Sequence, residues 1–67
     1  RYRKVDLADL EHYVGKEIRL RTELGKELDG VLLKVEEERI MMRRRVEHGL
    51  VTYPVNKSNI SSVKNFR

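Results

Sequence analysis

Three consecutive arginines, Arg43, Arg44 and Arg45, are the strongest chemical feature of the sequence. A guanidinium group binds phosphate or carboxylate oxygens through paired hydrogen bonds. In a β-strand Arg43 and Arg45 would lie on one face and Arg44 on the other, because successive side chains alternate. Two interpretations stay open: a solvated edge whose arginines pair with nearby glutamates, or a basic patch that binds an anionic partner.

Lysines and aromatic residues in the second half of the chain extend this candidate patch. We expect Lys57, Lys64, Tyr53 and Phe66 to lie close to the arginines in the fold. Cations interleaved with aromatic rings suit single-stranded nucleic acid, because phosphates pair with the cations and bases stack on the rings. The predicted nucleic-acid-binding residues are Arg43, Arg44, Arg45, Lys57, Lys64 and Tyr53.

The residue types that support catalysis do not converge in the sequence. His12 and His48 are isolated and lack the spacing of metal ligands, so we expect surface or capping roles for both. The serines near the C-terminal end have no histidine base in a plausible triad. Side chains of the consecutive Glu36–Glu38 would point apart, and there is no Cys to ligate a metal. We therefore predict a non-enzymatic protein without a metal or cofactor.

Length and charge indicate one small domain with an uneven charge distribution. The chain has 67 residues, 39% of them hydrophobic and 39% charged, and a net charge of +4. Residues 1–5 carry three cations, residues 6–38 carry ten acids against five bases (−5), and residues 39–67 carry seven bases against one acid (+6). The basic part could face nucleic acid or an anionic protein, or it could pair with the acidic part of this chain or of another copy.

No apolar run approaches the ~20 residues of a membrane-spanning helix. The chain does not begin with Met, so we expect a fragment of a longer protein and leave the localisation open, cytoplasmic if RNA is the ligand. Residues 1–5 are expected to be a basic linker or arm that precedes a domain at residues 6–67.

The elements that would position these residues are a short helix and five strands. Asp6–Val14 has an apolar stripe of Leu7, Leu10 and Val14, with Asp6 as a side-chain N-cap and Gly15 as the stop. Alternating patterns and turn residues then predict strands over residues 17–23, 27–35, 39–46, 50–55 and 60–66.

Two of these strands form the centre of the predicted sheet. A turn at Glu37 and Glu38 would pair Val35 with Ile40 and Leu33 with Met42, which places apolar pairs on one face. Gly30 inside the earlier strand suggests a bulge or a sharp bend, and Pro54 marks an edge strand because it lacks an amide hydrogen. The predicted class is mainly β: a short N-terminal helix followed by a five-stranded, strongly bent barrel.

The order of elements and several short motifs resemble the Sm-like family, which includes Sm, LSm and bacterial Hfq proteins. The residues that carry the resemblance are Tyr13–Ile18, Gly25, Asp29–Leu32, Ile40–Met42 and Asn59–Val63. The resemblance implies an SH3-like barrel, a ring of six or seven copies, and RNA held by two motif loops. The sequence departs from the family at Glu38, where an aromatic would stack a base, at Ile40, where Asn would read its edge, and at Asn56–Lys57, where the family has Arg-Gly.

We therefore expect a non-catalytic module that binds single-stranded RNA through a basic face. The alternative, motivated by the missing RNA-reading residues, is a protein-interaction or assembly module that presents an edge strand or basic face. A homo-oligomer, as a ring or a smaller assembly, is possible under either interpretation.

Overall fold

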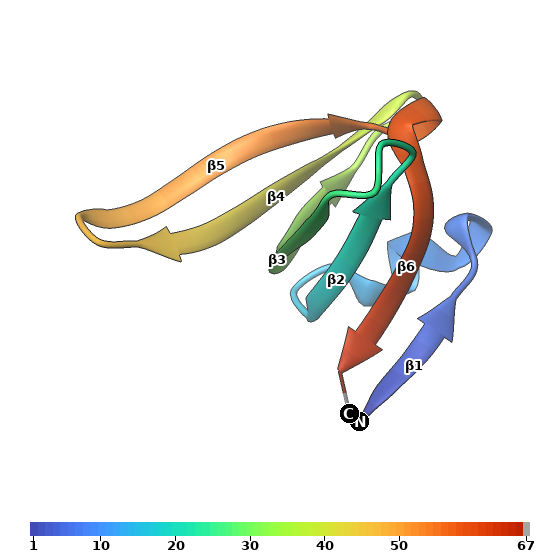
Figure 1. Ribbon diagram of the computed structural model, residues 1–67, viewed down its shortest axis with the longest axis horizontal. Coiled ribbons are helices and arrows are strands. Elements are labelled where there is room, and N and C mark those ends of the chain that lie inside the picture. Colours follow the sequence, from blue (N-terminus) through green and yellow to red (C-terminus); the bar gives the residue numbers. More distant parts are fainter. Residues whose placement is uncertain (67) are drawn as a thin grey trace.

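A single antiparallel sheet of six strands makes up most of the chain (Figure 1). The structure is a computed structural model and describes residues 1–66. Its elements in chain order are β1 (Tyr2–Val5), the 3-10 helix η1 (Leu7–Tyr13), β2 (Glu17–Thr22), β3 (Glu27–Val35), β4 (Arg39–Val46), β5 (Gly49–Asn56), the 3-10 turn η2 (Lys57–Asn59) and β6 (Ile60–Phe66). The strand order across the sheet is β1-β6-β2-β3-β4-β5.

The mainly β class is confirmed, and β3, β4 and β6 have the bounds that the sequence predicted. Two features differ from expectation. Residues 2–5, expected in a linker or arm, form β1 and pair with Phe66–Val63 of β6, so the sheet has six strands instead of five. The sheet is also not closed: β1 and β5 are its two edges, and no pairing joins them within residues 1–66.

The N-terminal helical segment is a 3-10 helix whose only fully buried residue is Leu10. Leu7 and Val14, expected to share its apolar stripe, remain 41% and 47% exposed. A 3-10 helix repeats every three residues, and Tyr13 rather than Val14 follows Leu10 at this spacing and packs against the core. The predicted side-chain cap is wrong: the backbone carbonyl of Asp6, not its carboxylate, accepts from the amide of Asp9 at 2.9 Å.

The core lies on one side of the sheet, which we call the inner face, and the opposite side is the outer face. Inner-face side chains of all six strands, together with Leu10 of η1, exclude water from this layer. Burying apolar side chains of this size is the main stabilising term in so small a domain. The buried residues are Val5, Leu10, Ile18, Leu20, Leu32, Ile40, Met42, Val55, Ile60 and Val63.

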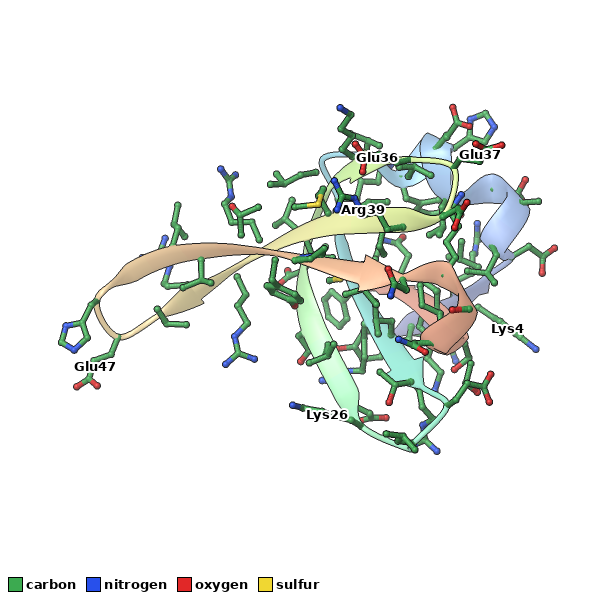
Figure 2. All side chains as sticks on the ribbon, turned by 90° about the horizontal axis from the view of Figure 1, so that it is seen from above. Lys4, Lys26, Glu36, Glu37, Arg39 and Glu47 are labelled. Atoms are coloured by element: carbon green, nitrogen blue, oxygen red, sulfur yellow. The ribbon has the colours of Figure 1, made fainter. Side chains whose placement is uncertain are left out.

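The turn between β3 and β4 forms where the sequence placed it. The Glu36 amide donates to the Arg39 carbonyl at 2.8 Å, and the Arg39 Nε donates to Glu36 Oε1 at 2.6 Å (Figure 2). The predicted pair of Val35 with Ile40 is confirmed.

The predicted pair of Leu33 with Met42 is wrong. Leu32 faces Met42, and the register shifts between Leu32 and Lys34, so the irregularity falls at Leu33 and not at Gly30. Gly30 has a different role, since a Cβ there would lie 2.7 Å from the Arg43 carbonyl oxygen. Glycine therefore permits the close approach of β3 to β4.

The far half of the β4–β5 hairpin extends beyond the rest of the sheet, and we call residues 44–51 the arm (Figure 1). Pairing of β3 with β4 ends at Val31 and Arg43, whereas pairing of β4 with β5 continues to Val46 and Gly49. In Figure 2, Glu47 marks the tip of the arm, far from the turn at Glu36. The arm is a two-stranded ribbon, and none of its residues belongs to the core formed by the described part of the chain.

Candidate nucleic-acid interface

A row of cations crosses the outer face of the sheet. Lys4 of β1 is paired with Lys64 of β6, Lys64 with Arg19 of β2, and Arg19 with Asp29 of β3. Directly opposed residues in antiparallel strands project from the same face with Cβ atoms about 4.5–5.5 Å apart. Three positive charges therefore lie side by side before the row ends on one carboxylate.

The arginine of this row is held in place by two neighbours. The Arg19 Nε and Nη2 donate to the two carboxylate oxygens of Asp29 at 2.6 and 3.1 Å. The hydrogen bond to Asp29 raises the pKa of Arg19 above its already high ordinary value. The guanidinium carbon also lies 4.7 Å from the centre of the Tyr2 ring, at cation–π distance.

The two lysines of the row have no carboxylate partner within residues 1–66. Both are exposed, and Lys4 points away from the body of the protein (Figure 2). The remaining cation on this part of the face, Arg21, is paired with Glu27 at 3.1 Å. Lys4 and Lys64 are therefore the outer-face charges of β1 and β6 that are available to an anionic ligand.

An aromatic pair lies next to the row. The rings of Tyr2 and Phe66 meet edge to face, with centres 5.2 Å apart and planes at 68°. They are 40% and 55% exposed, although residues of this kind are more often buried. Together with Glu17, Ile18 and Asp29 they line a shallow hollow of about 190 Å³.

A larger open groove adjoins this hollow and leads to the arm. Its volume is about 530 Å³, and it shares Glu17 and Asp29 with the aromatic hollow. Two of its lining residues, Arg43 and Arg45, project from the outer face of the sheet. They pair with Thr52 and Leu50 of β5, respectively. The full lining is Glu17, Asp29, Gly30, Val31, Arg43, Arg44, Arg45 and Leu50.

The structure separates the residues that the sequence grouped into one patch. Arg43, Arg45 and Lys64 share the outer face, as the alternation of strand residues predicts. Arg44 pairs with Val51 on the inner-face side of the hairpin. Lys57 lies in η2 at the base of the hairpin, where its amide donates to the Glu38 carbonyl at 2.9 Å.

Tyr53 faces the core and not a ligand. It pairs with Met42, and its ring is half-buried against the core. Its hydroxyl oxygen is buried and has no hydrogen-bond partner within the described part of the chain. Burial raises the pKa of the Tyr53 hydroxyl, and the nearby positive charge of Arg44 opposes this rise. The ring is therefore not a free surface on which a base could stack.

Sequence reasoning left Tyr2, Lys4 and Arg19 out of the candidate patch. It placed Phe66 in the patch but not among the predicted nucleic-acid-binding residues. Their proximity depends on the pairing of β1 with β6, which joins the two ends of the chain. The sequence carries little signal for this strand, because each of its faces combines one cation with one aromatic or apolar residue: Lys4 with Tyr2, and Arg3 with Val5.

Other site types receive no support from the geometry. Within residues 1–66 no three His, Cys, Asp or Glu side chains are grouped so as to hold a metal ion. The described part of the chain contains no helix of the length and apolar character needed to cross a bilayer. In comparisons with known proteins, no family model, no curated protein and no solved structure matches this chain.

Proposed function

We propose that the outer face binds single-stranded RNA without catalysing a reaction. Lys4 and Lys64 on one side, and Arg43 and Arg45 on the other, would contact phosphates. The observation that carries the proposal is the pair of exposed lysines, without a carboxylate partner among the described residues, beside the exposed Tyr2–Phe66 rings. Stacking of a base on an aromatic ring contributes about 1–3 kcal/mol, largely independent of sequence.

Acidic residues set the path that the RNA backbone would follow. Asp29 is neutralised by its two hydrogen bonds to Arg19, whereas Glu17 is exposed and has no cationic partner within residues 1–66. A phosphate beside Glu17 would be repelled, so the chain of phosphates would pass along the lysines and the arm rather than through the floor of the groove. Replacing Glu17 with Gln should tighten binding.

We further propose that the sheet is a variant of the Sm-like barrel with an additional edge strand. The short helix followed by five antiparallel strands, β2 to β6, supports this assignment. In the ring that the resemblance implies, β5 of one copy would pair with β6 of the next. Here β1 already pairs with β6 from Val63 to Phe66. We therefore propose that RNA is bound by a single copy and not by a ring.

Fluorescence anisotropy with a labelled oligouridine tests this function. Four phosphate contacts predict a salt slope of about −2.8, or a loss of about 50-fold in affinity between 50 and 200 mM salt. The double variant Lys4→Glu, Lys64→Glu should bind oligouridine with an affinity at least about tenfold lower. The matched control is Lys57→Glu, which makes the same kind of charge change away from the outer face.

Three outcomes would contradict the proposal. The first is that the chain does not bind oligouridine at physiological salt. The second is that Lys57→Glu and a single Lys64→Glu variant lose the same amount of affinity. The third is that Tyr2→Ala leaves the affinity unchanged. Light scattering of the same samples, with and without RNA, should give the mass of one chain. A mass of six or seven chains would contradict the single-copy assignment.

A further inference from the structure

The two edges of the sheet differ sharply in how they are protected. Exposed edges offer unpaired amides and carbonyls, and natural proteins blunt them with short strands, charges or Pro. The β1 edge is only four residues long and carries Arg3 and Lys4. The β5 edge is eight residues long, Gly49–Asn56, and contains no charged residue.

The β5 edge is also regular and exposed. Its pairing with β4 runs from Asn56 to Gly49 without a register shift, including at Pro54. Pro54 removes a single amide hydrogen near the base of the hairpin, so Gly49–Tyr53 remains a continuous edge. Leu50 and Val51 on this edge are 59% and 43% exposed. A strand of this kind is a ready template for one more strand.

Three arginines flank this edge, and both faces of the hairpin carry at least one of them. Arg43 and Arg45 project on the outer side of the hairpin and Arg44 on the inner side. All three are exposed, and none has a carboxylate partner within residues 1–66. A strand added to β5 would lie two strand spacings, about 9.5 Å, from β4. Extended Arg and Glu side chains together span this distance, and the intervening Val51 and Thr52 are short.

We propose that the β5 edge binds an extended acidic segment of a partner protein as a seventh strand. Backbone hydrogen bonds would provide affinity, and carboxylates on alternate faces would pair with Arg44 on one side and with Arg43 and Arg45 on the other. The site gives a role to Arg44, which pairs with Val51 on the inner-face side of the hairpin and is not among the proposed phosphate contacts. It does not involve Lys4 or Lys64.

Two other occupants fit this edge less well. A second copy paired through its own β5 would bring three more arginines within three strand spacings, about 14 Å, of the first three, and each chain carries a net charge of +4. A nucleic acid offers phosphates but not the regular alternation of amide donors and carbonyl acceptors that an edge strand pairs with.

Binding of a labelled twelve-residue peptide with the repeat Glu-Glu-Val-Thr tests the proposal, because consecutive Glu residues of an extended strand project on both faces. Anisotropy with the full chain should show binding, and a peptide with Lys in place of each Glu should not bind. N-methylation of one set of alternate peptide amides should abolish binding, whereas methylation of the other set should leave it intact, because only one set faces β5.

Protein variants locate the site. Arg44→Glu together with Arg45→Glu should weaken peptide binding by about tenfold or more. The control Lys4→Glu, Lys64→Glu should leave peptide binding unchanged while it weakens oligouridine binding. Failure of the peptide proposal can therefore be distinguished from failure of the RNA proposal.

NMR of the unliganded and bound chain decides between occupants. The expected result is that amides of residues 49–53 become protected only when peptide is added. Protection of these amides without peptide, together with a doubled mass, would overturn the proposal in favour of a second copy. Equal binding of both N-methylated peptides, or protection of residues 49–53 by oligouridine, would also overturn it.

Discussion

Replacing Gly30 with Ala tests how closely β3 must approach β4. The added Cβ would lie 2.7 Å from the Arg43 carbonyl oxygen and 3.3 Å from the Met42 Cε. The methionine end can rotate, but the carbonyl belongs to the paired backbone of β4. Restoring an ordinary contact of 3.4 Å requires the strands to separate locally by about 0.7 Å, at the position from which the arm extends.

The expected loss follows from two opposing terms. Overpacking a well-packed site lowers the free energy of unfolding by about 1–3 kcal/mol. Replacing a glycine in a strand interior with alanine raises it by about 0.5–1 kcal/mol, because the unfolded chain loses conformational entropy. The net loss should be about 1–2 kcal/mol in the free energy of unfolding, which lowers the melting temperature by about 5–15 °C in a domain of this size. Thermal and urea unfolding followed by circular dichroism measure both quantities.

Gly25 provides the control for this substitution. Nothing lies within 4 Å of a Cβ built there, but its φ of +88° disfavours any side chain. The loss at Gly30 should therefore grow from Ala to Val, whereas the loss at Gly25 should depend little on side-chain size. A Gly30→Ala variant as stable as the unmodified chain would refute the steric argument.

Two further predictions concern the core and the acidic turn. Leu32→Ala, at a fully buried site, should destabilise by about 2–5 kcal/mol, while Leu24→Ala, 98% exposed, should leave urea unfolding nearly unchanged; similar losses would refute the assigned core. The hydrogen bond from Arg39 lowers the pKa of Glu36, so the stabilising contribution of this carboxylate is complete above its ordinary pKa and is lost as the pH falls through the lowered value. An NMR titration should show the Glu36 midpoint rising in Arg39→Ala, and an unchanged midpoint would contradict that cause.

Local patterns were sufficient to predict most of the sheet. Alternation and the acidic turn predicted the bounds of β3 and β4, and Pro54 correctly marked an edge strand. The bulge was not predictable, because Leu32 and Leu33 are chemically equivalent and either could face Met42. β1 was missed because it has only four residues, two of them charged, and its partner lies at the other end of the chain.

The candidate site was predictable only in part, because nearness in sequence is a poor guide to nearness on a twisted sheet. Alternation correctly separated Arg44 from Arg43 and Arg45. It could not show that Lys57 lies at the opposite end of the hairpin from the arm, nor that Tyr53 turns towards the core. The lysine pair across β1 and β6 depends on a non-local contact that no short motif encodes.

The arm has a consequence for how this protein moves. A two-stranded ribbon beyond the reach of a third strand is marginally stable by itself, so residues 44–51 should open and close without unfolding of the body. Their amide hydrogens should then exchange with solvent long before those of β2 or β3. Arg44 and Arg45 therefore lie on a segment that opens readily, and whatever binds there must first restrain it.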